Sequence, residues 1–437
     1  MNIVMLTNTY LPHVGGVARS VDAFCREYRK RGHQVLVVAP EFSEKIANEK
    51  DVVRIPAIQN FNGSDFSVAL PLSLELTERL DFFEPDLVHS HHPFLLGMTA
   101  LRIARSREIP LVFTHHTLYE RYTHYVPTDS EALKRFVIEL ATRYGNLASM
   151  VFAPSESVAD LLRERGVQSP VNVVPTGVQL DNYRNGDGMA ARRQYGIPES
   201  AFVVGHLGRL AAEKNLNFLS ETVLELMQRN TDIHFLVVGT GPIENHIRTL
   251  FEAQGLSDRL HLTGTLQGNA QRDAYSAMNV FGFSSTSETQ GMVLTEAMAA
   301  GVPVVALDAS GSREVVEDRV NGRLVLKHST RELLAALQWV HDLPNGEYAN
   351  LRQAALATAE RFSMENCATK ALEHYQSLVH QHWPLDDSLY AQWMRLRNMI
   401  GAQWEILEGV TSAASAALDL DHLGGSHHSD RSGNNHP

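Results

Sequence analysis

The sequence is short of three features that mark common protein classes: cysteine, long apolar runs and excess positive charge. Its two cysteines, Cys25 and Cys367, are too few and too far apart for a disulfide framework or a cysteine-based metal site. No run approaches the roughly 18 apolar residues of a membrane span, and the N-terminal residues lack the positive segment of a cleavable signal. We therefore expect a cytoplasmic protein that is neither secreted by such a signal nor integral to a membrane.

The charge balance is acidic, because 38 Lys and Arg residues stand against 50 Asp and Glu residues, for a net charge of -12. Proteins that bind nucleic acid normally carry the opposite sign, since they neutralise phosphates. We expect no nucleic-acid partner.

Apolar runs alternate with helical stretches along most of the 437 residues, which is typical of parallel sheets covered by helices on both faces. Gly, Pro and Asn interrupt this pattern over 175–200, which predicts a linker between domains, and the pattern then restarts. We predict an α/β fold with two doubly wound, Rossmann-like domains that face a central cleft. The predicted parts are residues 1–180, residues 181–380, a helical segment over 381–417 and a disordered tail over 418–437.

Two groups of small or polar residues follow predicted strands of the first domain. Gly15 and Gly16 open the first helix, where backbone N–H groups can face an anion or a sugar hydroxyl, although a tight turn explains the pair equally well. Five histidines follow two later strands, so their imidazoles could line one cleft. These histidines are His89, His91, His92, His115 and His116.

The His-x-His spacing raises the alternative of a metal-dependent hydrolase resembling amidohydrolases. Such enzymes use one eight-stranded barrel, whereas this chain divides near residue 180, and no carboxylate ligand pairs with the histidines in the sequence. We favour hydrogen bonds from one or two neutral imidazoles to a substrate.

The second domain carries charged residues where the first carries histidines. Arg209 and Lys214 follow its first strand and suit a diphosphate, although a solvated helix start is an equal alternative. Glu288 precedes a helix whose N-terminal N–H groups near Gly291 can hold phosphate. Glu296 lies on that otherwise apolar helix and would need a polar partner if buried, while an exposed helix edge is the plainer reading. Two carboxylates at this spacing suit a sugar nucleotide.

In this order, the motifs resemble glycosyltransferase family 4, whose members are retaining enzymes of the GT-B fold. The resemblance covers most of residues 1–380. It implies that Gly16 lies beside the donor diphosphate, that Glu296 holds the ribose and that Glu288 holds donor-sugar hydroxyls. It also implies catalytic roles for His116, Glu288, Arg209 and Lys214. The donor-binding residues that it implies are Gly15, Gly16, Arg209, Lys214, Glu288, Thr289, Gln290, Gly291, Met292, Val293 and Glu296.

The resemblance also implies that neither a metal nor another cofactor is needed, because cations and helix dipoles neutralise the leaving diphosphate. A donor phosphate oxygen then takes the acceptor proton, so we assign no side chain as general base. We expect the donor to be UDP-glucose, with GDP-mannose as the alternative. The sequence departs from the family at Gln290, where an aromatic residue is frequent, and this departure bears on the identity of the donor sugar.

A narrower resemblance, carried by residues 113–125 and 287–291, is to bacterial diacylglycerol glucosyltransferases. It implies a lipid acceptor and a peripheral contact of the N-terminal domain with the inner face of the membrane. A soluble sugar or a polyprenyl-linked acceptor is the alternative, since the chain lacks a cluster of basic residues after residue 125. The acceptor-binding residues expected on this basis are His91, His92, Tyr119, Arg121, Tyr122 and Tyr125.

Overall fold

A computed structural model describes residues 1–13, 15–42, 49–58, 68–69, 74–121, 130–286, 288–381, 387–390 and 393, with the backbone alone at 57–58, 68–69, 74–75 and 121. The chain divides into two compact units, Met1–Pro384 and Leu385–Pro437. Two parallel sheets lie in the first unit, and the described residues of the second are helical. The rest of the predicted helical segment and the predicted tail lie outside the described residues.

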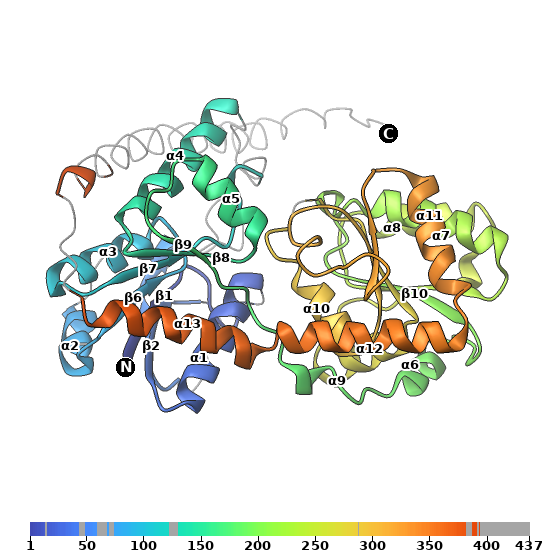
Figure 1. Ribbon diagram of the computed structural model, residues 1–437, viewed down its shortest axis with the longest axis horizontal. Coiled ribbons are helices and arrows are strands. Elements are labelled where there is room, and N and C mark those ends of the chain that lie inside the picture. The colour runs from blue at the N-terminus through green and yellow to red at the C-terminus, as the bar shows by residue number, and fades with distance from the viewer. Residues whose placement is uncertain are drawn as a thin grey trace, which may run out of the picture. The chain divides into compact units, whose positions relative to one another are not determined.

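The first sheet is built from apolar runs that are buried on both faces, as parallel strands require. Its strand order is β3-β2-β1-β6-β7-β8-β9, with all neighbours parallel. The chain therefore runs from β1 toward one edge, returns, and runs from β6 toward the other edge (Figure 1). The strands are β1 (Asn2–Leu6), β2 (Gln34–Pro40), β3 (Val52–Ile55), β6 (Leu87–Ser90), β7 (Leu111–Thr114), β8 (Met150–Ala153) and β9 (Val171–Val173).

Helices connect these strands, and serine side chains begin two of them. Ser130 and Ser155 each accept a hydrogen bond from a backbone N–H of the first helical turn, which satisfies a group that the helix itself leaves unpaired. A short antiparallel pair, β4 (Ala57–Ile58) and β5 (Val68–Ala69), lies apart from the main sheet. The helices are α1 (Gly16–Lys30), α2 (Leu74–Phe83), α3 (Leu96–Arg107), η2 (Tyr119–Arg121), α4 (Glu131–Leu147) and α5 (Glu156–Glu164).

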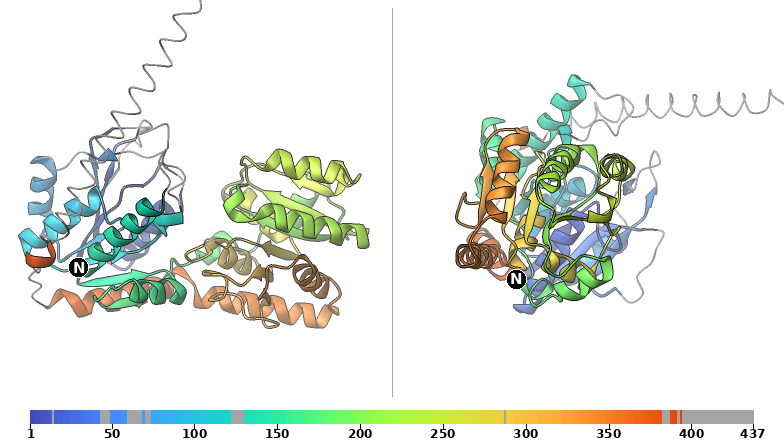
Figure 2. Two further views of the ribbon diagram at one scale, coloured as in Figure 1. Left: turned by 90° about the horizontal axis from the view of Figure 1, so that it is seen from above. Right: turned by 90° about the vertical axis from the view of Figure 1, so that its right-hand side faces the viewer.

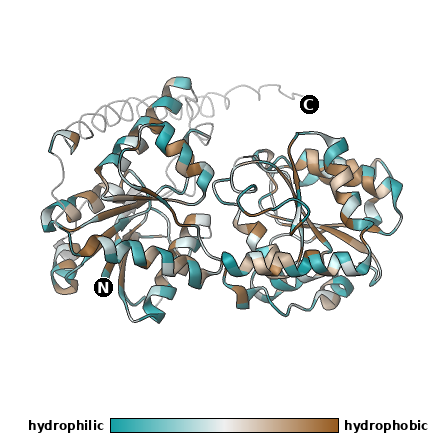
Figure 3. Ribbon diagram, viewed as in Figure 1, coloured by the Kyte–Doolittle hydropathy of each residue, from teal (hydrophilic) through white to brown (hydrophobic). Residues whose placement is uncertain are grey.

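The second sheet repeats this arrangement with six parallel strands in the order β12-β11-β10-β13-β14-β15. Its first strand again lies inside the sheet, with later strands added on both sides. In Figure 3, where brown marks hydrophobic and teal marks hydrophilic residues, the strands of both sheets are largely brown. The outer faces of the helices are largely teal. The strands are β10 (Phe202–Leu207), β11 (Ile233–Val238), β12 (Leu260–Leu262), β13 (Val280–Phe283), β14 (Val304–Leu307) and β15 (Gly322–Val325).

The helices around this sheet include one inside the stretch that we expected to be a linker. There, α6 packs against α9, so part of 175–200 belongs to the second α/β layer. Its N-cap, Asp187, accepts a hydrogen bond from Ala190 N. The helices are η4 (Leu180–Asn182), α6 (Gly188–Tyr195), η5 (Ala212–Lys214), α7 (Leu216–Arg229), α8 (Glu244–Glu252), η6 (Ser257–Arg259), α9 (Gly268–Ala277), α10 (Met292–Ala299) and α11 (Thr330–His341).

The last two long helices pack on different sheets. Helix α12 (Asn345–Arg361) packs on α10, and the chain then continues into α13 (Met364–Val379), which packs on α1 (Figures 1 and 2). The crossing at residue 363 runs beside the crossing at residue 178, where Val178 N donates to Phe362 O. Gly177 permits this approach, because a Cβ there would lie 2.2 Å from Met364 Cα.

The α/β prediction with two doubly wound units is therefore confirmed. The domain boundaries stay predictions. By its sequence position α13 falls in the second predicted domain, but its buried side chains join the core of the first sheet. Within the described ranges, no helix combines the length and the apolar content needed to cross a membrane.

Candidate active site

Each sheet has a switch point, where the strands on its two sides continue the chain in opposite directions. The first lies between β1 and β6, and the second lies between β10 and β13. Ligands of doubly wound folds bind beyond the carboxyl ends of the strands at such points. Most of the predicted site residues follow these four strands or begin the next helices.

The histidine group, defined as His89, His91, His92, His115 and His116, lies at the carboxyl ends of β6 and β7. Four of its side chains are buried, and His116 is partly exposed. Burial, followed by the neighbouring histidines or, for His115, by Arg165, lowers the pKa of His89 and His91 well below the usual range and that of His92, His115 and His116 to about 3. All five imidazoles are therefore neutral at pH 7.

Hydrogen bonds hold several of these rings in fixed positions. His91 Nδ1 lies 2.9 Å from His116 Nε2. His92 Nδ1 accepts a hydrogen bond from Asn8 N at 3.1 Å. His91 and His92 are 1% and 5% exposed, so their side chains are packed inside the first domain, and their role in acceptor binding stays a prediction.

The other predicted acceptor residues follow β7. Tyr119 lies in η2, where its ring packs edge-on against Phe94 and His115, and its hydroxyl is buried. The backbone of Arg121 ends the same turn. Tyr122 and Tyr125 lie outside the described residues.

The metal-hydrolase alternative finds no support in the part of the chain that the structure describes. No group of three or more His, Cys, Asp or Glu side chains there has the arrangement that could hold a metal ion.

The carboxyl ends of β10 and β13 bring together opposite charges. Lys214 Nζ lies 2.5 Å from Glu288 Oε1, and Ser285 Oγ donates to the same oxygen at 2.9 Å. Both charged side chains are about one-fifth exposed, so this pair remains accessible. Arg209 lies nearby in sequence, with its guanidinium 3.9 Å from Glu213 and a side chain that is 59% exposed.

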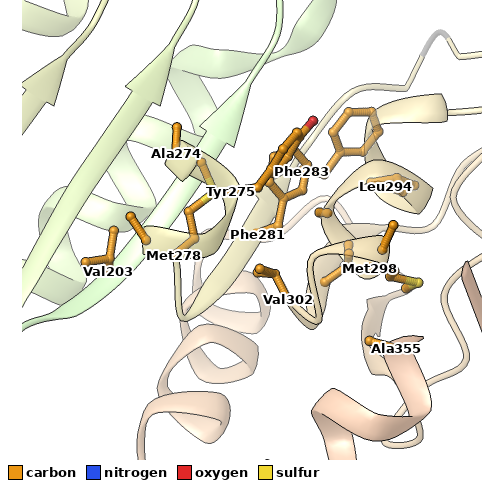
Figure 4. Packing of buried hydrophobic residues seen from close by; sticks show 14 of the residues in the cluster. Val203, Ala274, Tyr275, Met278, Phe281, Phe283, Leu294, Met298, Val302 and Ala355 are labelled. Carbon is orange, nitrogen blue, oxygen red and sulfur yellow. The ribbon is translucent and has the colours of Figure 1, made fainter. Parts of the chain in front are cut away.

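Glu296 is buried on α10 among polar partners, as a carboxylate on an apolar helix requires. Tyr275 Oη donates to its Oε2 at 2.9 Å, and Arg19 Nη1 lies 3.3 Å from its Oε1. Burial and the adjacent carboxylate raise the pKa of Tyr275, which keeps the hydroxyl protonated as a donor. Figure 4 shows Tyr275 packed beside Phe281 and Phe283, so its position is set by the hydrophobic core.

The starts of α1 and α10 lie close together. A Cβ on Gly16 would lie 3.6 Å from the terminal methyl group of Met292, the first residue of α10, and Gly15 is the N-cap of α1. Gly291, the N-cap of α10, has φ +70°, a left-handed conformation that glycine adopts without strain. Met292 and Val293 follow it with partly exposed side chains.

Two residues of the 288–291 loop bind the backbone of the first domain and its connection. Thr289 Oγ1 donates to His116 O at 3.0 Å. The Gln290 amide accepts from Thr176 N at 2.7 Å and donates to Thr176 O at 2.5 Å. Gln290 is 6% exposed, so its side chain is used to hold this backbone.

Sequence reasoning did not single out several partners in this site. Arg19 and Tyr275 contact Glu296, Thr176 binds Gln290, and Ser155 Oγ donates to Thr289 O at 2.7 Å. Arg19 lies 277 positions from Glu296, and no local pattern connects them. The one sequence signal for these partners was Glu296, since a buried carboxylate on an apolar helix needs a polar partner.

Two family models match the chain in succession. Glycosyltransferase Family 4 matches residues 14–182, and Glycosyl transferases group 1 matches residues 189–358. The chain belongs to glycosyltransferase family 4. This confirms the family that the ordered motifs indicated, and the enzyme class is therefore glycosyltransferase.

Among similar proteins is the alpha-monoglucosyldiacylglycerol synthase of Streptococcus pneumoniae, 28% identical over 332 residues that cover 74% of this family 4 chain and 75% of that protein. The GDP-mannose-dependent alpha-mannosyltransferase of Corynebacterium glutamicum is 27% identical over 390 residues, which cover 87% and 89% of the two chains. The narrower resemblance to diacylglycerol glucosyltransferases is thus confirmed as a similarity.

The solved structure of HepE from Anabaena in complex with UDP-glucose has the same fold. Its TM-score is 0.68 at 23% identity, and the match covers 86% of this chain and 99% of that one. The GT-B fold that the resemblance implied is confirmed.

Proposed function

We propose that this family 4 enzyme transfers glucose from UDP-glucose to the hydroxyl of diacylglycerol, with retention of configuration and without a metal ion. The observation that carries the donor half of the proposal is the Lys214–Glu288 pair at the second switch point. Similarity to two alpha-monoglucosyldiacylglycerol synthases supports the choice of glucose and of a lipid acceptor.

In this proposal, the donor exchanges partners with the Lys214–Glu288 pair. The diphosphate attracts Lys214, with Arg209 as a second cation, while sugar hydroxyls donate to the Glu288 carboxylate that Lys214 leaves. Through this exchange Lys214 stays paired with negative charge and Glu288 stays hydrogen-bonded, which limits the desolvation cost. The leaving diphosphate then meets preorganised positive charge, which is the main source of rate acceleration that we assign to the second domain.

The remaining predicted residues hold the ribose, the phosphates and the transferred sugar of the donor. Glu296, fixed by Tyr275 and Arg19, accepts hydrogen bonds from the ribose, and the N–H groups at the starts of α1 and α10 face the phosphates. His116 contacts the sugar from the first domain. The acceptor lies on the side of the histidine group and reaches it from a membrane surface.

A second candidate function is mannosyl transfer from GDP-mannose to a soluble or polyprenyl-linked acceptor. Similarity to GDP-mannose-dependent alpha-mannosyltransferases favours it. The residues that hold diphosphate and ribose serve both donors in the same way, so the donor has to be identified by experiment.

The test incubates purified protein and chelator with UDP-glucose or GDP-mannose. Acceptors are diacylglycerol vesicles, a polyprenyl phosphate and a pool of soluble sugars, and products are read by mass spectrometry. Glucosyl-diacylglycerol formed in chelator is the expected product. Mannosylated product alone would establish the second candidate, and activity that requires added metal would contradict the metal-free proposal.

A further inference from the structure

His91 is a buried residue with one hydrogen-bonded ring nitrogen and one that has no partner among the described residues. Its Nδ1 lies 2.9 Å from His116 Nε2, and the two rings face each other at a centroid distance of 5.2 Å. Its Nε2 is buried and contacts no hydrogen-bonding group in the described part of the chain. The direction of the His91–His116 hydrogen bond therefore determines which ring nitrogen of His116 carries the proton.

Both rings are neutral, because burial lowers the pKa of each histidine. A neutral imidazole carries one N–H and one lone pair, so one of the two rings donates and the other accepts. If His116 donated, the His91 proton would lie on Nε2 and would be a buried N–H without an acceptor. A buried N–H without an acceptor loses its hydrogen bonds to water without compensation, and such donors are rarer in folded proteins than bare acceptors. Donation from His91 Nδ1 leaves only a bare lone pair at Nε2.

The neighbouring His89 cannot offer a hydrogen to that lone pair. Its Nδ1 lies 2.5 Å from Tyr375 Oη of α13, and its Nε2 lies 2.7 Å from Thr114 Oγ1. Tyr28 Oη donates to Tyr375 Oη, so the Tyr375 hydrogen goes to His89 Nδ1 and the His89 proton lies on Nε2, toward Thr114. The His89 ring packs against His91 at a centroid distance of 4.2 Å and restricts its rotation.

We infer that His91 is a positioning residue that donates from Nδ1 to His116 Nε2 and thereby makes His116 present an Nδ1–H donor to the substrate. The His116 backbone is held as well, since its carbonyl oxygen accepts from Thr289 Oγ1. The ring is thus fixed at Nε2 and at the main chain, with Nδ1 as its remaining polar atom. Resting on the proposed function, this gives His116 one role: hydrogen-bond donation to an oxygen of the nucleotide sugar, and no proton abstraction from the acceptor.

The test measures the tautomer of His116 and the activity of the enzyme in separate experiments. Long-range proton–nitrogen NMR spectra of histidine-labelled full-length protein show which ring nitrogen of His116 is protonated, with the spectrum of His116→Phe assigning its signals. Two variants of similar size change the partner: His91→Asn retains an N–H near the position of Nδ1, whereas His91→Leu removes it. Steady-state kinetics with UDP-glucose give kcat and KM for each.

We expect a proton on His116 Nδ1 in the wild-type protein and in His91→Asn, and a mixture of tautomers in His91→Leu. The expected loss of kcat in His91→Leu is about 10- to 100-fold, with a small change in the KM for the donor and substantial recovery in His91→Asn. A wild-type proton on His116 Nε2, or equal losses in both variants with an unchanged tautomer, would overturn the inference. If no nucleotide sugar is turned over, the proposed function fails, while the wild-type spectrum still decides the tautomer.

Discussion

The two switch points occupy equivalent places in two similar sheets, but their chemistry is opposite. At the first, the imidazoles are neutral and bind one another, the backbone or hydroxyl side chains. At the second, Lys214 and Glu288 form an accessible ion pair. A doubly wound sheet therefore fixes where a ligand can bind, while the side chains after the strands determine whether the site suits charged or uncharged groups.

The largest expected effect concerns the charged pair at the second switch point. In Lys214→Ala the diphosphate loses its point charge and Glu288 loses its partner, so we expect kcat/KM for the donor to fall by about 100- to 1000-fold. Steady-state kinetics with the exposed Lys327→Ala as control measure this loss. A Lys214→Ala rate within about threefold of the control would refute the assigned role.

The next effect concerns the contact that joins the two regions. Gln290→Leu removes both hydrogen bonds to Thr176 and leaves a buried N–H and C=O unpaired, so we expect the free energy of unfolding to fall by about 1–3 kcal/mol. Urea denaturation measures this change. The preference between UDP-glucose and GDP-mannose should stay as in the wild type, since the amide holds backbone; a reversed preference would show that Gln290 contacts the donor.

A smaller effect tests whether the buried histidines at the first switch point are neutral. Burial lowers the pKa of His115 to about 3, below the unfolded value of 6.5, so unfolding takes up a proton between these two pH values and stability falls as the pH falls through this window. His115→Leu should reduce the slope of unfolding free energy against pH by up to about 1.4 kcal/mol per pH unit. Urea denaturation from pH 4 to 7 tests this, and an unchanged slope would mean that His115 is protonated in the folded state.

The smallest effect supplies a control of opposite sign, far from both switch points. Hydrogen bonds to Asp342 and Asp232 raise the pKa of His341 despite its partial burial. The stabilisation is therefore fully present below the unfolded pKa of 6.5 and is lost as the pH rises through the higher folded value. His341→Gln should lower stability by less than about 1 kcal/mol at pH 5.5 and by still less at pH 9. Thermal melts at both values measure it, and a larger loss at pH 9 would contradict the sign.

The local pattern of apolar residues in the sequence was sufficient to predict much of the fold. Runs such as Ile233–Val238 are apolar throughout, and that pattern indicates a strand covered on both faces. The edge strands β3 and β15 were not predicted, because in each an arginine interrupts the short apolar run. Helix α6 was missed because Gly and Asn around it indicated a connection.

The candidate site divides in the same way. The order of the motifs in the sequence was enough to indicate the family and to nominate three residues. Lys214 and Glu288 follow strands, and Glu296 is a carboxylate on an otherwise apolar helix. Their partners depend on contacts between distant segments: Arg19 meets Glu296 across 277 positions, and Tyr375 of α13 reaches His89 across 286. Residue type and local spacing encode what a side chain can do. Which hydrogen-bond partner it meets, and hence where its proton lies, is settled when the folded chain packs these segments together and water is excluded from between them.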